Sequence, residues 1–322
     1  MNMIDAIKAF PKQFEYKPKV ENSERLDKHD KFVVVGMGGS ALSGGLLKIF
    51  LPGIDVLIHK SYGLPQLSED DLKQRLVIAS SYSGNTEETI DALSQAIKND
   101  LDVAVIASGG KMIELAKENN VPYVVIPDTG IQPRMALGFN LLGLLKLMDF
   151  EDFLSSASEL SKHLEASASE KQGKELATKM KDHVPIIYGS DDNMAVIYNW
   201  KIKFNETGKI PAFFNVVPEL NHNEMTGFDT QDSSKHLSEK FYFIFLKDQD
   251  DDSRIQKRMK VLQKLYEDRG LPVEVIEMKG SSKLEKVFTS LLLADWAALY
   301  IAELYGLEAE QVPMVEEFKK LI

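Results

Sequence analysis

The sequence predicts an α/β protein with two doubly wound domains, each a parallel sheet covered by helices on both faces. Apolar, β-branched runs alternate with amphipathic helical patterns, which is typical of parallel strands buried on both sides. The order of these elements repeats in the second half of the chain although the residues hardly do, and this favours a duplicated domain over one long sheet. The length of 322 residues is sufficient for two domains of ordinary size.

In the first half we expect strands at residues 32–36, 56–59, 76–80, 103–106 and 123–126, with helices at 40–50, 86–99 and 112–119. The apolar run at residues 135–148 predicts a buried core helix. Helical spacing continues through residues 152–182, and a second series of strands begins at 185–190, 241–246 and 270–276. We therefore expect a first domain at residues 1–150, a helical linker at 151–184, and a second domain with a C-terminal helix at 185–322.

The composition limits the classes of partner. Hydrophobic residues make up 44% and charged residues 27%, as in globular proteins, and the formal net charge of −11 argues against general nucleic-acid binding. The absence of cysteine excludes disulfides, thiolate nucleophiles and cysteine-ligated metals. The N-terminus has no signal-type apolar segment, and no uncharged apolar stretch is long enough to span a membrane. We expect a cytoplasmic protein with neither a nucleic-acid nor a membrane partner.

A hydroxyl-rich turn at residues 80–89 follows the expected strand 76–80 and opens a helix. The first amides of a helix lack partners within the helix, and the helix dipole is positive at that end, so such a turn binds phosphate. Ser81, Ser83 and Thr86 add hydroxyl donors, and Gly84 allows close backbone approach. The turn has no Lys of the nucleotide-binding type, which suits a sugar phosphate better than ATP. The alternative is an ordinary turn in which Ser or Thr only caps the helix.

A glycine turn follows the first strand, with the sequence Gly36-Met37-Gly38-Gly39-Ser40-Ala41. A dinucleotide site would need a different glycine spacing and an acidic residue after the second strand, where His59 and Lys60 stand instead. We therefore expect Gly38, Gly39 and Ser40 to line a sugar site, with Ser40 as a helix cap or a ligand. In the second half the counterpart of the phosphate turn, residues 247–252, is acidic and would repel phosphate.

Together these motifs carry a family resemblance. The two turns resemble those of the sugar isomerase (SIS) domain. Three later stretches narrow the resemblance to the bifunctional phosphoglucose/phosphomannose isomerases of archaea and bacteria: Pro133-Arg134-Met135-Ala136-Leu137-Gly138, Asn205-Glu206-Thr207-Gly208-Lys209-Ile210-Pro211-Ala212 and Pro218-Glu219-Leu220-Asn221-His222-Asn223-Glu224. The resemblance spans nearly the whole chain. It implies two SIS-type three-layer αβα domains with the active site between them, and a homodimer whose subunits share active sites.

The resemblance implies reversible isomerisation of glucose 6-phosphate, and of mannose 6-phosphate, to fructose 6-phosphate through an enediol. An acid/base pair must open the hexose ring, a base must move a proton between C2 and C1, and a cation should stabilise the enediolate. No hydride moves, so we expect no cofactor. We also expect no metal at the site. The sequence does not fix the preference for glucose or mannose, nor the physiological direction.

The resemblance places the proton-transfer base at Glu206 and the enediolate-stabilising cation at Arg134. The alternative for Glu206 is a solvated side chain at a helix end. The alternative for Arg134 is a surface residue paired with a carboxylate.

The resemblance assigns ring opening to His222, supplied by the neighbouring subunit, and to a lysine on the terminal helix. His222 could instead be held by backbone carbonyls, or could bind a metal with Glu219 and Glu224, although the spacing is not that of a zinc helix. Lys319 matches the family lysine best, but an unusual segment before it leaves the register between Lys319 and Lys320 open. Lysines near a helix C-terminus also favour the helix dipole.

Two rival functions remain at the level of the sequence. SIS domains also serve as non-catalytic sugar-phosphate-binding regulators, but the presence of Glu206 and His222 and the lack of a DNA-binding appendage favour an enzyme. The other rival is an isomerase of another sugar phosphate, such as an amino sugar, but those enzymes add an amidotransferase domain or use another site pattern.

Overall fold

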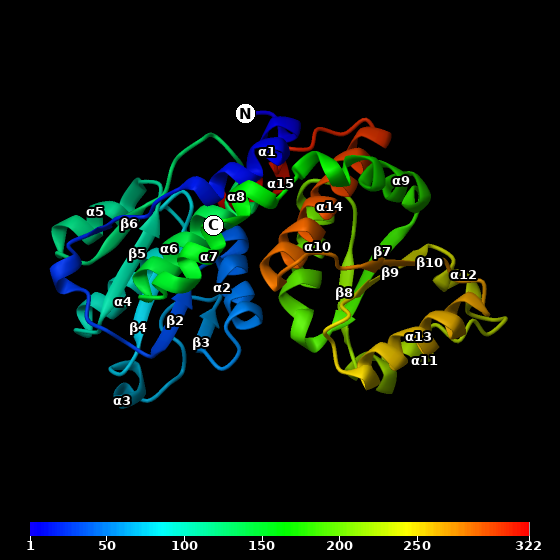
Figure 1. Ribbon diagram of the computed structural model, residues 1–322, viewed down its shortest axis with the longest axis horizontal. Coiled ribbons are helices and arrows are strands. Elements are labelled where there is room, and N and C mark those ends of the chain that lie inside the picture. Colours follow the sequence, from blue (N-terminus) through cyan, green and yellow to red (C-terminus); the bar gives the residue numbers. More distant parts are fainter. Residues whose placement is uncertain (322) are drawn as a thin grey trace. The chain divides into compact units, whose positions relative to one another are not determined.

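The computed structural model describes residues 1–321, which fold into two compact units (Figure 1). The first unit comprises Met1 and Lys8–Leu164. The second comprises Asn2–Ile7, which form most of helix α1 (Met3–Ala9), together with the chain from Glu165 onward. The expected linker at residues 151–184 is helical throughout much of its length, and its status as a separate segment stays a prediction.

The first unit contains a six-stranded sheet in the order β1-β6-β5-β4-β2-β3. The strands are β1 (Val20–Glu21), β2 (Lys31–Val35), β3 (Asp55–His59), β4 (Leu76–Ser80), β5 (Val103–Ala107) and β6 (Tyr123–Val125). Strands β2 to β6 are parallel, as the sequence predicts. The antiparallel edge strand β1 was not expected, because a strand of two residues is too short to leave an alternating pattern.

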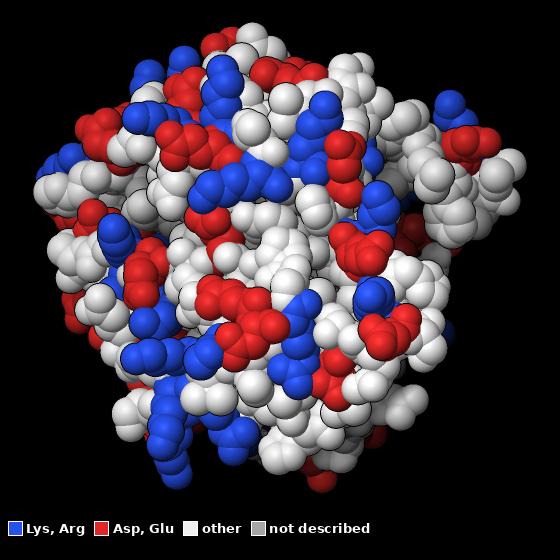
Figure 2. Space-filling model, turned by 90° about the vertical axis from the view of Figure 1, so that its right-hand side faces the viewer, with Lys and Arg blue, Asp and Glu red and all other residues white. Residues whose placement is uncertain are grey.

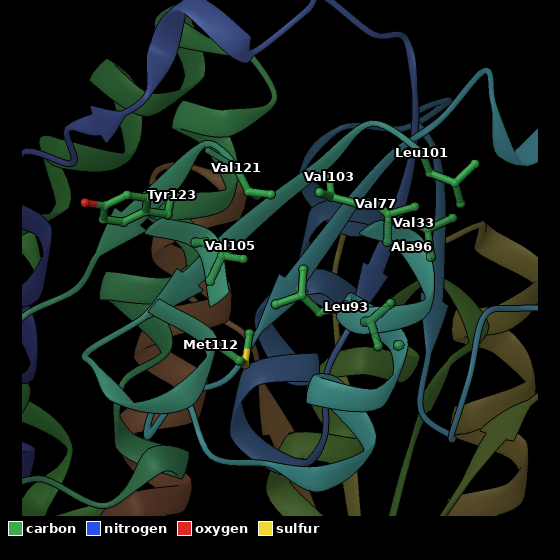
Figure 3. Packing of buried hydrophobic residues seen from close by; sticks show 14 of the residues in the cluster. Val33, Val77, Leu93, Ala96, Leu101, Val103, Val105, Met112, Val121 and Tyr123 are labelled. Atoms are coloured by element: carbon green, nitrogen blue, oxygen red, sulfur yellow. The ribbon is translucent and has the colours of Figure 1, made fainter. Parts of the chain in front are cut away.

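Helices cover both faces of this sheet. The helices of this unit are α2 (Gly38–Phe50), α3 (Glu69–Leu72), α4 (Glu87–Lys98), α5 (Gly110–Glu118), α6 (Leu137–Leu147), α7 (Glu151–Ser158) and α8 (Leu160–His163), with short 3₁₀ helices η1 (Phe10–Glu15), η2 (Ser23–Arg25) and η3 (Pro133–Met135). Strand residues such as Val33, Val77 and Val105 pack against Leu93 of α4 and Met112 of α5 (Figure 3). Helices α2 and α6 pack on the other face, so the expected three-layer arrangement is confirmed.

The second unit contains a four-stranded parallel sheet in the order β10-β9-β7-β8. The strands are β7 (Val184–Ser190), β8 (Phe213–Val217), β9 (Phe241–Lys247) and β10 (Val273–Glu277). The helices are α9 (Glu170–Met180), α10 (Met194–Glu206), α11 (Glu224–Gly227), α12 (Lys235–Ser238), α13 (Ser253–Glu267), α14 (Lys283–Leu304) and α15 (Pro313–Lys319), with η4 (Ala166–Ser169), η5 (Asp191–Asn193) and η6 (Glu219–His222). Helix α13 covers one face of the sheet, and α10 and α14 cover the other.

The two units share one topology. The order β3-β2-β4-β5 in the first corresponds to β8-β7-β9-β10 in the second, so the first strand of each series lies between the second and the third. This is the doubly wound pattern, in which ligands bind where the strand order reverses, at the carboxyl ends of the strands. The predicted duplication is therefore visible in the strand order although the residues differ.

Helix α14 is long and apolar enough to span a membrane by length and composition alone. However, 78% of its most apolar window is buried inside the fold, where it packs against α9 and α10. It is therefore the core helix of the second unit. On the face of the molecule drawn in Figure 2, Lys and Arg side chains are interspersed with Asp and Glu over most of the surface, and several Lys and Arg side chains adjoin at the lower left.

Candidate active site

In the first unit, the two sequence motifs meet at the topological switch point. Strand β2 leads into the glycine turn and α2 on one face of the sheet. The neighbouring strand β4 leads into the hydroxyl-rich turn and α4 on the other face. Because parallel strands end at the same edge, both turns lie at the position where doubly wound sheets bind ligands.

The hydroxyl-rich turn presents a concentrated set of donors. The Oγ of Ser81 lies 2.8 Å from Oγ1 of Thr86, and it accepts a hydrogen bond from the Gly84 amide at 3.2 Å. Thr86 occupies the N-cap position of α4, but its side chain makes no capping hydrogen bond. The alternative of a turn whose hydroxyl only caps the helix is therefore wrong for Thr86. Ser83 is exposed, and its Oγ accepts from the Asn85 amide at 3.2 Å.

Glycine is required at position 84 for two reasons. Its φ is +70°, a left-handed conformation that side chains rarely adopt, and a Cβ there would lie 1.8 Å from the carbonyl oxygen of Gly109. The loop after β5 thus packs directly against the backbone of the turn. The close backbone contact that requires glycine here is made to Gly109 of this chain, and the approach of the Gly84 backbone to a bound anion stays a prediction.

The glycine turn packs against the segment that carries Arg134. A Cβ on Gly39 would lie 2.4 Å from the carbonyl oxygen of Pro133 and 2.9 Å from Cα of Arg134. Arg134 is 2% exposed, so the alternative of a surface arginine is wrong. The fold therefore brings Gly39 and Arg134 together although they are 95 positions apart in the chain.

Ser40 joins the two turns. Its Oγ accepts a hydrogen bond from the Tyr82 amide at 3.1 Å, and the residue is buried. The hydroxyl does not cap α2, whose N-cap residue is Met37. Ser40 therefore links the sugar-type turn to the phosphate-type turn, and its direct contact with a sugar stays a prediction, as do those of Gly38 and Gly39.

Asn140 contacts both turns, and the sequence analysis missed it. From the interior of α6, its Nδ2 donates to the Ser40 carbonyl at 2.8 Å, and its Oδ1 accepts from the Ser80 hydroxyl at 2.8 Å. Asn140 is 4% exposed. A single amide inside the apolar run 135–148 was the available signal, since a buried polar side chain must find partners.

In the second unit, Glu206 is the last residue of α10 and is half-buried rather than fully solvated. A buried ion pair fixes the helix behind it: Lys203 Nζ lies 2.5 Å from Asp295 Oδ1 of α14, with both side chains at most 3% exposed. The turn that follows is also close-packed, because a Cβ on Gly208 would lie 2.7 Å from the Phe204 carbonyl oxygen. Helix α10 thus holds Glu206 on a rigid support.

Lys209 connects the end of α10 to the segment before α15. Its ammonium donates to the backbone carbonyls of Glu206 and Gln311, two residues before α15 begins. Lys319 is the last residue of α15 and is exposed, with Nζ 2.8 Å from Glu316 Oε1. The ammonium of Lys319 lowers the pKa of the Glu316 carboxyl. The register between Lys319 and Lys320 stays open.

His222 lies at the other end of the same sheet. Strand β8 separates it from Glu206, because Glu206 precedes the start of β8 and His222 lies in η6 just after its end. Five residues of strand span roughly 15 Å. His222 is exposed, and no side-chain hydrogen bond to it is found among residues 1–321. The structure thus does not bring Glu206 and His222 of one chain together through this strand.

The two carboxylates that could bind a metal together with His222 both accept hydrogen bonds from other side chains. The carboxylate of Glu224 is engaged by the Tyr188 hydroxyl and the Asn215 amide. Glu219 is occupied by the Asn223 amide at 2.7 Å. Within the described part of the chain, residues 1–321, no group of three or more His, Asp or Glu residues has the arrangement of a metal site.

The acidic counterpart turn in the second unit carries its own anion. The buried Asp248 carboxylate accepts from the Asp250 amide at 3.1 Å and from Lys286 Nζ at 2.8 Å. Donors at the end of β9, the strand equivalent to β4, are thus already hydrogen-bonded to a carboxylate of the chain itself. The expectation that only the first unit keeps a phosphate-type turn agrees with this arrangement.

The chain is similar to known proteins. Residues 169–322 match the family model described as the bacterial phospho-glucose isomerase C-terminal SIS domain. The chain is 32% identical over 320 residues to the bifunctional phosphoglucose/phosphomannose isomerase of Aquifex aeolicus, covering 98% of this chain and 96% of that protein. It is 33% identical over 338 residues to the enzyme of the same name from Caldicellulosiruptor bescii, covering 98% of each.

The fold is also that of solved phosphosugar enzymes. The crystal structure of tagatose-6-phosphate ketose/aldose isomerase from Escherichia coli is similar with a TM-score of 0.70 at 15% identity, covering 96% of this chain and 95% of that one. The family model and the full-length relatives place the chain in the class of SIS phosphosugar isomerases. With its full-length relatives, the chain belongs to the family of bifunctional phosphoglucose/phosphomannose isomerases.

Proposed function

We propose that the protein interconverts glucose 6-phosphate, and mannose 6-phosphate, with fructose 6-phosphate as a cytoplasmic homodimer. The observation that carries the proposal is the turn before α4 in a chain of this family. There the Ser81 and Thr86 hydroxyls meet at 2.8 Å beside helix amides that Thr86 does not cap. Hydroxyl and amide donors at a helix N-terminus suit the phosphate of a hexose 6-phosphate.

The other candidate residues have separate roles in the reaction. Ring opening needs an acid and a base at the ring oxygen and the anomeric hydroxyl, and His222 and Lys319 supply these roles. Glu206 then moves a proton between C2 and C1, and Arg134 stabilises the enediolate oxygen. The ion pair between Lys203 and Asp295 supports the base by fixing α10. No step transfers a hydride or needs a metal.

The topology of the second unit supports a site shared between two copies. Glu206 and His222 lie at opposite ends of β8, roughly 15 Å of strand apart. Groups that act on one hexose must both lie within hydrogen-bonding reach of it. A homodimer in which one copy supplies Glu206 and the other supplies His222 meets that requirement without moving the strand.

The first experiment is a coupled assay with glucose 6-phosphate and mannose 6-phosphate, run with and without EDTA. Turnover of both sugars that is indifferent to EDTA is the expected result. Binding without turnover would instead identify a regulator, and turnover of only another sugar phosphate would identify a different isomerase. Loss of activity with EDTA, restored by a metal, would contradict the metal-independent mechanism.

Glu206→Gln tests the base. The amide keeps the shape and removes the basicity, so we expect a loss in kcat of about a thousandfold or more, with sugar-phosphate binding largely intact. The matched control is Glu267→Gln, which changes the last residue of another helix, α13, in the same unit. Wild-type turnover in Glu206→Gln would remove this residue from the mechanism.

Mixing inactive Glu206→Gln and inactive His222→Ala protomers tests the shared site. A mixed dimer would carry both lesions in one site and leave the other intact. Because half of random dimers are mixed, and each has one intact site, activity should recover to about a quarter of wild type after subunit exchange. No recovery despite demonstrated exchange would show that each site takes its histidine from its own chain.

A further inference from the structure

A hydrogen-bonded carboxylate lies beside the loop that carries His222. Glu224, two residues after His222, begins α11 and is half-buried. One of its carboxylate oxygens, Oε2, accepts from Asn215 Nδ2 of β8 at 2.5 Å, and the other, Oε1, accepts from the Tyr188 hydroxyl of β7. Hydrogen bonds to an ionised acceptor are about twice as strong as neutral ones.

Both donors are fixed by their own surroundings. Tyr188 is completely buried, and its ring centroid lies 5.4 Å from that of Phe245 and 5.7 Å from that of Phe243. Burial, with Tyr266 and Glu224 nearby, holds the pKa of Tyr188 far above its ordinary value, so its hydroxyl stays protonated. The Oδ1 of Asn215 accepts from the Val216 amide at 2.8 Å, which fixes Nδ2 toward Glu224.

Hydrogen bonds fix the loop at residues 219–224 on both sides of His222. The Asn223 Nδ2 donates to Glu219 Oε1 at 2.7 Å, and the Asn223 Oδ1 accepts from the Glu224 amide at 2.6 Å. The imidazole of His222 is exposed between these contacts, and within residues 1–321 no side-chain hydrogen bond orients it. Its position therefore depends on the backbone that Glu224 attaches to the sheet.

We propose that Glu224 is a positioning residue for His222: its carboxylate, held by Tyr188 and Asn215, fixes the loop that presents the imidazole for ring opening. This inference rests on the ring-opening role in the proposed function. It assigns Glu224 to the sheet side of the loop rather than to the substrate. Its loss should therefore affect only the step that uses His222.

The Asn215–Glu224 pair allows a test by charge exchange. Asn215→Asp places two carboxylates opposite each other at the 2.5 Å contact, and they repel. Adding Glu224→Gln restores a pair of one carboxylate and one amide, with the carboxylate now at position 215 and the amide at position 224. The carboxylate at position 215 still offers an oxygen that accepts from the Val216 amide. Glu224→Ala removes the attachment outright.

The experiment compares a cyclic with an acyclic substrate. Glucose 6-phosphate is cyclic, whereas 5-deoxyfructose 6-phosphate lacks the hydroxyl that closes the furanose ring and stays open. Isomerisation of the first and solvent deuterium exchange at C1 of the second are measured for each variant, with His222→Ala alongside. Glu274→Gln is the matched control, because Glu274 forms a second tyrosine–glutamate pair, with Tyr242, at β10.

For Glu224→Ala and Asn215→Asp we expect kcat/KM on glucose 6-phosphate to fall about tenfold to a hundredfold, as for loss of a hydrogen bond to a charged group, while exchange on the open analogue changes less than about threefold. The double variant Asn215→Asp/Glu224→Gln should return to within about threefold of wild type on both substrates. Retained exchange on the open analogue also shows that the variants fold. Glu274→Gln should change neither activity.

Three results would overturn the inference. If His222→Ala impairs the cyclic substrate selectively but Glu224→Ala does not, Glu224 does not act through His222 and the proposed function stands. Equal losses on both substrates, or no rescue by the exchanged pair, would assign Glu224 to general stability or to the proton transfer. If His222→Ala opens glucose 6-phosphate normally, the ring-opening role itself fails, and the positioning role with it.

Discussion

Replacing Asn140 by leucine tests whether this residue holds the two turns of the first unit in their positions relative to each other. Leucine branches at Cγ as asparagine does and suits the apolar surroundings of α6, but it removes both hydrogen bonds of the amide. The Ser80 hydroxyl, 1% exposed, then loses the partner 2.8 Å away, and the Ser40 carbonyl loses the Asn140 amide. An orphaned buried hydroxyl costs about 1–3 kcal/mol and a lost hydrogen bond about 1 kcal/mol, so the free energy of unfolding should fall by about 2–4 kcal/mol.

Urea unfolding of Asn140→Leu measures this loss, and a double-mutant cycle with Ser80→Ala separates its parts. Because Ser80→Ala removes the orphaned hydroxyl, the double variant should be less destabilised than the sum of the single variants by about 1 kcal/mol or more. Asn119→Leu is the matched control, since Asn119 is exposed and its amide bonds only within the end of its own helix. We also expect a raised KM, because Ser40 and Ser80 belong to the turns that we propose bind the substrate.

A loss below about 0.5 kcal/mol in Asn140→Leu, or strict additivity with Ser80→Ala, would refute this reasoning. It would mean that the two turns keep their positions without the amide. Unchanged stability with a raised KM would instead assign Asn140 to the substrate.

Two further predictions concern the phosphate turn and the buried acid of the second unit. Thr86→Val and Ser83→Ala each remove a hydroxyl donor, so inhibition constants for a sugar-phosphate analogue should rise about tenfold to a hundredfold; unchanged constants would move the phosphate site elsewhere. Burial, with the charges of Asp248 and Asp192, raises the pKa of Asp251 above its ordinary 3.8. The folded state therefore binds a proton on the Asp251 carboxyl more tightly than the unfolded chain does. The stability that this bound proton contributes is lost as the pH rises from about 4 through the raised pKa. Asp251→Asn lacks this loss, so its stability relative to wild type in urea unfolding should improve from about pH 3.5 to pH 7, and a pH-independent difference would contradict the assignment.

The strands of the first unit could be predicted because each is a local pattern. Expected strand 76–80 coincides with β4, and the apolar run 135–148 contains α6. The hydroxyl-rich turn was recognisable for the same reason, since strand, donors and helix start follow one another within ten residues. Strand β1 was missed because its two residues gain their conformation only from pairing with β6.

The partners of the site residues could not be predicted, because they come from distant parts of the chain. Asn140 lies 100 residues from Ser40, and Asp295 lies 92 residues from Lys203. Each is visible in the sequence only as a polar residue within an apolar stretch of a helix. A buried polar residue of this kind indicates that a hydrogen-bond partner exists. It does not indicate which residue that partner is, because the partner depends on how the helices pack onto the sheets.

By itself, the sequence determined the class of the protein: two doubly wound domains, a phosphate-type turn in the first only, and the motifs of a phosphosugar isomerase family. These follow from residue types and spacings within short segments, where local geometry dictates the outcome. Only the tertiary structure decided which groups meet. Strand order places the two turns of the first unit side by side, and the direction of β8 places Glu206 and His222 at its opposite ends. The reason is physical: in a parallel sheet, the end of a strand at which a residue lies is set by the path of the whole chain, and no local pattern encodes that path.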